Sequence, residues 1–227
     1  MEGKIQFDLM SNAIDSIEHA VDLLAYEQAL DRSTVTKRAI ISLSHAIELL
    51  LKERLRKIHP ALIWESVDRY PELDARTVTT ETALRRLKKI GGLGFSEKDE
   101  QLLRSIRKIR NAIEHYKWSI AGEEAEYITG SSLDFAVVFL KEHLGKELLG
   151  YAERKGGVLQ DLMAKNRSFA LSYERRASEK IADTEQSCGF CRALLGLEDK
   201  GLCPKCGHWN YFSSPDGGCD WDDDVPF

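Results

Sequence analysis

Four cysteines near the C-terminus are the residues of this 227-residue chain best suited to bind a metal ion. They form two Cys-x-x-Cys pairs separated by eleven residues, Cys188 with Cys191 and Cys203 with Cys206. Each pair can present two thiolates to one ion, and four sulfur ligands complete a tetrahedral zinc site. Because such a site leaves no position open for a substrate, we expect one structural zinc ion. The alternative is a set of unrelated or disulfide-bonded cysteines.

Two other residues near the C-terminus also have side chains that can bind metals. His208 could replace a cysteine, but it competes poorly with a complete set of four thiolates. Cys219 is the fifth cysteine, and we expect a free thiol there.

Five aspartates and no lysine or arginine follow Cys206, which predicts a solvated acidic tail. A second interpretation of this tail is a phosphate mimic that masks a basic site.

A second group of residues that could do chemistry is Arg110, Asn111 and His115. They lie in a segment whose apolar residues recur with the period of a helix. At about 100° per residue, Asn111 and His115 fall opposite the apolar stripe, and Arg110 falls at its edge, about 140° from His115. The stripe consists of Leu102, Ile106, Ile109, Ile113 and Tyr116.

Further charged residues belong to the same predicted helix. The simplest interpretation is a solvated face, on which Arg110 pairs with Glu114 one turn later. On that interpretation His115 is an ordinary surface histidine. The cations on or beside the polar face are Arg104, Arg107 and Lys108.

Hydrophobic periodicity predicts helices over most of the chain before residue 185. The predicted helices cover about 5–30, 35–58, 80–90, 97–118, 132–151 and 158–181, with irregular chain at 60–78. Ser96 is the predicted N-cap of the fourth helix, and Ser131 or Ser132 that of the fifth. No alternating strand pattern precedes residue 185. The body of the protein is therefore predicted to be all-α.

Composition and breaks in the pattern divide the chain into four predicted parts. These are a helical bundle over 1–155, a helical connector over 156–184, a zinc module over 185–212 and an acidic tail over 213–227. The net charge of −5 belongs to the tail, because positions 1–205 are balanced. The longest apolar stretch, 135–140, is too short to cross a membrane, and no secretory signal opens the chain. We therefore expect a cytoplasmic protein without membrane contact.

Two of these motifs resemble known families. The pattern Arg110-Asn111-x-x-x-His115, late in a helix of an all-α domain, resembles the Arg-x4-His motif of HEPN domains. A preceding helix is similar too, because Glu48 and Lys52 interrupt an apolar run one turn apart. The resemblance covers about residues 5–155. The second cysteine pair, Cys-Pro-Lys-Cys-Gly at 203–207, resembles the knuckle of a zinc ribbon.

The HEPN resemblance implies both a fold and an activity. HEPN domains are four- to five-helix bundles that usually dimerise, and many are metal-independent endoribonucleases of toxin–antitoxin or other defence systems. It implies catalytic roles for Arg110, Asn111 and His115, and RNA contacts for the cations around them. A base, an acid and a cation are what cleavage of RNA without a metal requires. Because Arg110 and His115 point apart on one helix, two copies facing each other would form one composite site.

Two other functions agree with the same residues. One is a non-catalytic HEPN scaffold that binds RNA, a nucleotide or a protein partner such as an antitoxin or activator. The other is a zinc-ribbon adaptor whose helical body only dimerises. The intact motif and the neighbouring cations favour the nuclease, whereas the balanced charge of the body agrees with the scaffold.

Overall fold

The structure is a computed structural model that describes residues 8–146, 148, 158–180, 186–187 and 194–195. Over these residues the predicted all-α body is confirmed. The α-helices are α1 (Leu9–Ala25), α2 (Arg32–Ile58), α3 (Thr80–Lys89), α4 (Glu97–His115), α5 (Gly122–Leu144), α7 (Val158–Lys165) and α8 (Arg167–Lys180). Two short 3₁₀ helices, η1 (Pro60–Ile63) and η2 (Val67–Arg69), lie between α2 and α3. Two-residue strands, β1 (Gln186–Ser187) and β2 (Leu194–Leu195), pair antiparallel.

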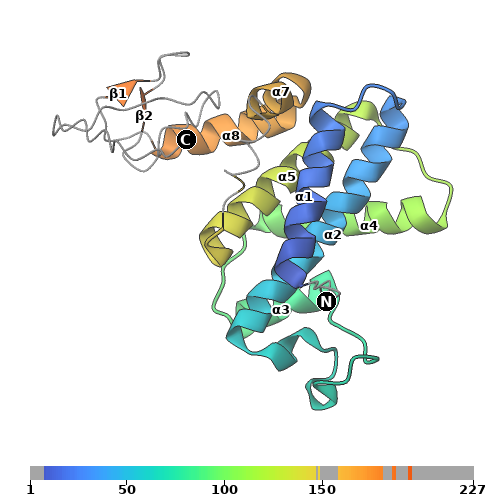
Figure 1. The fold of residues 1–227 in the computed structure, drawn as a ribbon, viewed down its shortest axis with the longest axis vertical. Helices are drawn as coiled ribbons and strands as arrows, with labels where there is room; N and C mark the ends of the chain where they lie inside the picture. The colour runs from blue at the N-terminus through green and yellow to red at the C-terminus, as the bar shows by residue number, and fades with distance from the viewer. Residues whose placement is uncertain (1–7, 147, 149–157, 181–185, 188–193, 196–227) are drawn as a thin grey trace, which may run out of the picture.

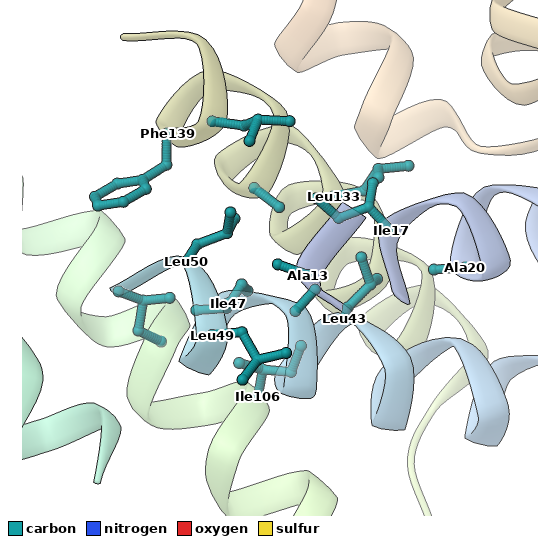
Figure 2. Close-up of a cluster of buried hydrophobic side chains, with 14 of the residues drawn as sticks. Ala13, Ile17, Ala20, Leu43, Ile47, Leu49, Leu50, Ile106, Leu133 and Phe139 are labelled. Carbon is teal, nitrogen blue, oxygen red and sulfur yellow. The ribbon is translucent and has the colours of Figure 1, made fainter. Parts of the chain in front are cut away.

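Helix α2 is the central element of the bundle (Figure 1). It packs along α1 and also contacts α3, α4, α5 and η1, while α7 lies against α1 and α8 against α5. The apolar faces of α1, α2, α4 and α5 meet in one buried core (Figure 2). Its members include Ala13, Ile17, Ala20, Leu43, Ile47, Leu49, Leu50, Ile106, Leu133 and Phe139.

The helix boundaries follow from capping side chains. The predicted cap at Ser96 is confirmed, because its Oγ accepts a hydrogen bond from Asp99 N at 3.0 Å. Helix α2 begins at Arg32 rather than at 35, because the Asp31 carboxylate accepts a hydrogen bond from Thr34 N at 3.0 Å. Helix α4 ends at His115, three residues before the predicted end. The first predicted helix, 5–30, is shorter in the structure, where α1 ends at Ala25. Residues 5–7 of that prediction lie outside the described residues.

The predicted start of the fifth helix at Ser131 or Ser132 is wrong. Helix α5 begins at Gly122, and both serines are buried in its middle. At the preceding residue, Gly130, α8 and the corner before it approach α5 closely. A Cβ at Gly130 would lie 2.3 Å from Asn166 Oδ1 and 2.7 Å from Phe169 N. Gly130 therefore belongs to a helix contact, and the two serines lie inside a continuous helix.

The predicted single helix over 158–181 is divided into α7 and α8 at Asn166. The Asn166 side chain is buried, and its Oδ1 accepts a hydrogen bond from Phe169 N at 2.9 Å. Its Nδ2 donates to Thr129 Oγ1 of α5 at 3.4 Å. The corner between the two helices is thus attached to α5.

The segment predicted to be irregular, 60–78, folds as the two 3₁₀ helices and an isolated bridge between Trp64 and Thr77. Arg86 of α3 holds the segment, since its guanidinium donates to the carbonyl oxygens of Leu62, Trp64 and Glu65 at 2.6–2.8 Å. Burial lowers the pKa of Arg86. Among the described helices, none combines the length and apolar character that crossing a bilayer requires.

Candidate functional site

The last turns of α4 carry the predicted Arg-x4-His residues. The prediction that Leu102, Ile106 and Ile109 face the core is confirmed, because all three are buried. The assignment of Tyr116 to the apolar stripe is wrong, because its side chain is 76% exposed. The helix ends one residue earlier, and Tyr116 has the extended backbone angles φ −139° and ψ 163°. This change of direction turns the tyrosine away from the core.

Arg110 is held by two neighbours on the same helix. Its Nε lies 2.9 Å from Glu114 Oε2, and its Nη1 donates to Asn111 Oδ1 at 3.1 Å. The predicted pairing of Arg110 with Glu114 is therefore confirmed. The side chain of Arg110 is 42% exposed and that of Glu114 is 30% exposed, so solvent reaches the pair. An exposed pair of this kind is easily exchanged for another anion, such as a phosphate.

His115 is the last residue of α4 and is exposed. Its ring makes an edge contact with Tyr116, with centroids 6.4 Å apart and planes at 74°. The imidazole forms no hydrogen bond with the part of the chain that the structure describes. It is thus available to a ligand or to a second protein chain, as its position opposite the apolar stripe predicts.

A hollow of about 260 Å³ lies between α3 and α4, and we call it the α3–α4 hollow. The three predicted RNA-binding cations line it together with Asn111. Arg104 is paired there, with its Nη2 2.9 Å from Glu100 Oε2 and its Nε 3.8 Å from Glu81 Oε2. The cations of the hollow are Arg104, Arg107 and Lys108.

The charge of the α3–α4 hollow is therefore positive. Arg107 and Lys108 have no ion-pair partner among the described residues, and Glu81 is the carboxylate that lines the hollow with them. Unpaired cations beside an open hollow suit a polyanion such as an RNA backbone. Asn111 connects this surface to Arg110 through their hydrogen bond. Neither Arg110 nor His115 lines this hollow, so Asn111 is the motif residue that reaches it.

The structure also contains a larger hollow, of about 690 Å³, that sequence reasoning missed. We call it the α2–α5 hollow, because the N-terminal turns of α2 and α5 form much of its lining. The connection between α4 and α5 contributes Tyr116 and Trp118, and α7 contributes Lys165. No motif could have identified this hollow, since its lining comes from α1, α2, α4, the connection after α4, α5 and the end of α7. The signal nearest to it is the pair of aromatic residues that directly follows His115.

Glu48 and Lys52, the second part of the HEPN resemblance, have structural contacts. Lys52 Nζ lies 2.6 Å from Glu48 Oε1 and donates to Thr77 Oγ1 at 2.9 Å. The lysine is buried, and its contact with Thr77 attaches α2 to the segment before α3. These two residues therefore contribute to the packing of the bundle and lie apart from the polar end of α4.

The four predicted zinc ligands, Cys188, Cys191, Cys203 and Cys206, lie outside the described residues. So do His208, Cys219 and the tail over 213–227. Strands β1 and β2 flank the first cysteine pair, with Gln186 opposite Leu195. In the described part of the chain, no three His, Cys, Asp or Glu side chains gather as a metal site would require.

Comparison with family models, curated proteins and solved structures found no match to this chain. The function of the site is therefore argued from its own residues. Those residues provide an exposed histidine and a solvent-accessible arginine on α4, beside a cationic hollow between α3 and α4.

Proposed function

We propose that this protein is a metal-independent endoribonuclease of a defence or toxin–antitoxin system, with a HEPN-like bundle that acts as a homodimer. The observation that carries the proposal is the end of α4, where His115 is exposed and Arg110 is accessible to solvent beside the cationic α3–α4 hollow. His115 can transfer a proton, Arg110 can bind a phosphate, and the cations of the hollow can attract an RNA backbone.

In the proposed reaction, one imidazole accepts the proton of a 2′-hydroxyl, and that oxygen attacks the adjacent phosphorus. A second imidazole donates a proton to the 5′-oxygen as the bond between phosphorus and that oxygen breaks. The products are a 2′,3′-cyclic phosphate and a 5′-hydroxyl. Arg110 stabilises the charge of the crowded phosphorane through its planar donors. Asn111 positions the phosphate or the imidazole of the partner subunit.

The reaction needs an acid and a base on opposite sides of one phosphate, and each chain has one His115. Two chains related by a two-fold axis would supply both imidazoles and both Arg110 side chains to one cleft. The exposed end of α4, with His115 and Tyr116, is the proposed contact surface. Arg104, Arg107 and Lys108 would then extend the RNA-binding surface along each helix. A protein that is monomeric in solution would contradict the composite site.

The test of this function is cleavage of total RNA by the purified full-length protein in EDTA. The wild type should cleave, and His115→Ala should reduce the rate by about 10²–10⁴-fold because a proton-transfer step is lost. His19→Ala is the matched control, since His19 is an exposed histidine on α1, far along the chain from the motif. Analysis of the ends should find 2′,3′-cyclic phosphates. Cleavage that requires magnesium, or an unchanged rate in His115→Ala, would contradict the proposal.

For the C-terminal segment we propose a zinc ribbon held by Cys188, Cys191, Cys203 and Cys206. Its support is the spacing of the two pairs and the short antiparallel strands that flank the first of them. Four thiolates would give the ion a structural role. Elemental analysis should find about one zinc per chain, and replacing Cys203 and Cys206 by serine should remove it. Cleavage in EDTA at an unchanged zinc content separates this role from catalysis.

Two contacts of Arg110 favour the non-catalytic scaffold as a second candidate function. Arg110 already has Glu114 and Asn111 as partners within its own helix. If those contacts persist when RNA binds, the motif would serve to bind RNA, a nucleotide or an antitoxin or activator protein. RNA binding by both wild type and His115→Ala, with cleavage by neither, would identify the scaffold.

A further inference from the structure

The α2–α5 hollow has an apolar side and a cationic side, and we propose that it binds the acidic tail of the same chain. The segment that would bind is 220–227, with the sequence Asp-Trp-Asp-Asp-Asp-Val-Pro-Phe. This inference goes beyond the nuclease proposal, because the contact would form whether or not the protein cleaves RNA. It also assigns a place in the fold to the interpretation of the tail as a mask.

Aromatic and aliphatic side chains form one side of this hollow. Tyr116 is 76% exposed, and Trp118 is partly buried against the core. Both belong to the connection between α4 and α5, and both line the hollow with Ile113 and Ile120. Flat apolar surface that is open to water gains free energy when another aromatic side chain covers it. This side of the hollow therefore suits the side chain of Trp221.

Charged side chains give the hollow a positive surplus. Three cations line it, Arg32, Lys37 and Lys165, against the carboxylate of Glu126. That carboxylate is already engaged, since its Oε1 accepts a hydrogen bond from Arg167 N at 2.8 Å and its Oε2 lies 3.7 Å from Arg32. An acidic occupant would thus meet more positive than negative charge.

Lys37 is the cation most available to such an occupant. It is exposed and makes no hydrogen bond or ion pair with the described residues, whereas the Lys165 ammonium donates to the carbonyl of Ala25. The tail segment has aspartates on both sides of Trp221 and contains no lysine or arginine. Its charge is therefore complementary to that of the hollow, with the aspartates next to the aromatic residue.

The α3–α4 hollow is also cationic, but it fits the tail less well. Its volume is about 260 Å³, against about 690 Å³ for the α2–α5 hollow. Among the described residues that line it, none is aromatic. It can attract the aspartates, but it offers no aromatic surface to Trp221. A segment that combines aspartates with a tryptophan therefore favours the α2–α5 hollow.

The tail is long enough to reach the hollow from the end of α8. Lys165, the last residue of α7, lines the hollow, and α8 begins two residues later at Arg167. Helix α8 has 14 residues, so it is about 21 Å long. Outside the proposed zinc ribbon, the eleven residues of 181–184 and 213–219 can span about 36 Å when extended. The segment can therefore return along α8 to the hollow.

An occupied hollow would also affect the end of α4. Tyr116 directly follows His115 and belongs to the proposed contact surface between two chains. A tail that covers this tyrosine would keep a second chain from the surface and so lower the rate of cleavage. This consequence rests on the proposed function, whereas binding of the tail does not. The two tests measure binding and need no cleavage, so their failure is distinguishable from failure of the nuclease proposal.

The first test is carbodiimide cross-linking of the full-length protein, which joins a lysine to a carboxylate in contact with it and adds no spacer. Digestion and mass spectrometry should find Lys37 linked to an aspartate of 220–224, in a product that runs as a single chain on a denaturing gel. Lys108 is the internal comparison, because it is exposed and lines the α3–α4 hollow. Tail links to Lys108 without any to Lys37, or links between two chains only, would overturn the proposal.

The second test is competition between the tail and a labelled peptide of residues 220–227, measured by fluorescence anisotropy. The tail variant is full-length protein with Trp221→Ala, Asp222→Asn, Asp223→Asn and Asp224→Asn, which frees the hollow. The wild type should bind the peptide about tenfold more weakly than the tail variant, or weaker still, because its own tail competes at a high effective concentration. Equal affinities, or binding by neither protein, would overturn the proposal.

Further substitutions in the tail variant locate the peptide. Lys37→Glu should weaken its binding by about tenfold or more, because a carboxylate then faces the aspartates. Arg38→Glu is the matched control, since Arg38 is the next residue, is exposed and does not line the hollow. Its affinity should stay within about twofold of that of the tail variant. If Arg107→Glu abolishes binding and Lys37→Glu does not, the tail occupies the α3–α4 hollow and the proposal is wrong.

Discussion

Helices α2 and α4 carry charged pairs with similar spacing in different surroundings. In α2, Arg56 donates from Nε and Nη2 to the two carboxylate oxygens of Glu53 at 2.6 and 2.7 Å, and the Glu53 side chain is only 3% exposed. In α4, Arg110 and Glu114 pair at 2.9 Å, but their side chains are 42% and 30% exposed. Arg56 contacts both carboxylate oxygens of its partner and Arg110 contacts one, and the exposure of the two carboxylate side chains differs about tenfold.

The difference shows that burial, more than spacing, decides what a charged pair does in this protein. Helix α2 is surrounded by α1, α3, α4 and α5, and the carboxylate of Glu53, which is buried there, needs a partner to be stable. At the end of α4, Arg110 and Glu114 are open to solvent, and they can exchange partners at little cost. The Arg56–Glu53 pair of α2 is thus structural, whereas the Arg110–Glu114 pair at the end of α4 can exchange for a ligand. Three measurements test this contrast.

The largest expected effect is on stability, from removing the arginine of each pair. Arg56→Ala should lower the free energy of unfolding by about 2–4 kcal/mol, because Glu53 would remain buried without a counter-charge. Arg110→Ala should lower it by less than about 1 kcal/mol, because Glu114 can turn to water. Urea unfolding of both variants and the wild type, followed by circular dichroism, measures the difference. Equal losses in the two variants would contradict the contrast.

The second effect is on cleavage, from Arg110→Lys. The substitution keeps the positive charge but removes the planar pair of donors, so the cleavage rate should fall by about tenfold to a hundredfold. The free energy of unfolding should be unchanged, because a lysine can still pair with Glu114 on an exposed helix face. Arg38→Lys, at an exposed position of α2, is the control. An unchanged rate in Arg110→Lys would show that the arginine serves only its pair with Glu114.

The smallest effect concerns Glu100 in the first half of α4, whose side chain is intermediate in exposure between those of Glu53 and Glu114. A hydrogen bond from Lys88 at 2.6 Å lowers the pKa of Glu100 below its ordinary value of 4.5. The stabilisation is therefore complete above about pH 4.5 and is lost as the pH falls through the lower pKa of the folded state. Lys88→Met should reduce the loss of stability between pH 6 and pH 3. Urea midpoints across that range measure it, and parallel pH curves for both proteins would contradict the assignment.

The sequence predicted those parts of the fold where local signals and packing agree. The range of α3 and the end of α2 before Pro60 were predicted to within one residue, and the cap at Ser96 is confirmed. Each has a strong local cause, such as a proline that cannot continue a helix or a serine that binds the first free N–H groups. The exposed position of His115 follows in the same way from helical period alone.

The features that were predicted wrongly, or not at all, depend on how segments far apart in the sequence are arranged in the fold. Ser131 and Ser132 have the residue type of a helix cap, yet both are buried in the middle of α5. Tyr116 fits the apolar period, but the helix ends just before it. The pairing of Arg110 with Glu114 was one of two interpretations, and sequence could not decide between them. The α2–α5 hollow could not be predicted at all, because no single segment contains enough of its lining.

The missing side chain at Gly130 has a consequence for the α2–α5 hollow. Lys165 and Asn166 line that hollow, and Asn166 Oδ1 lies where the Cβ of any other residue at position 130 would be. An alanine there would have to push the α7–α8 corner outward, although Gly130 itself does not line the hollow. The distance between α5 and the α7–α8 corner, and with it the width of the hollow, is therefore limited by a residue that does not line the hollow. A change at one glycine could retune which ligands fit while every lining residue stays the same.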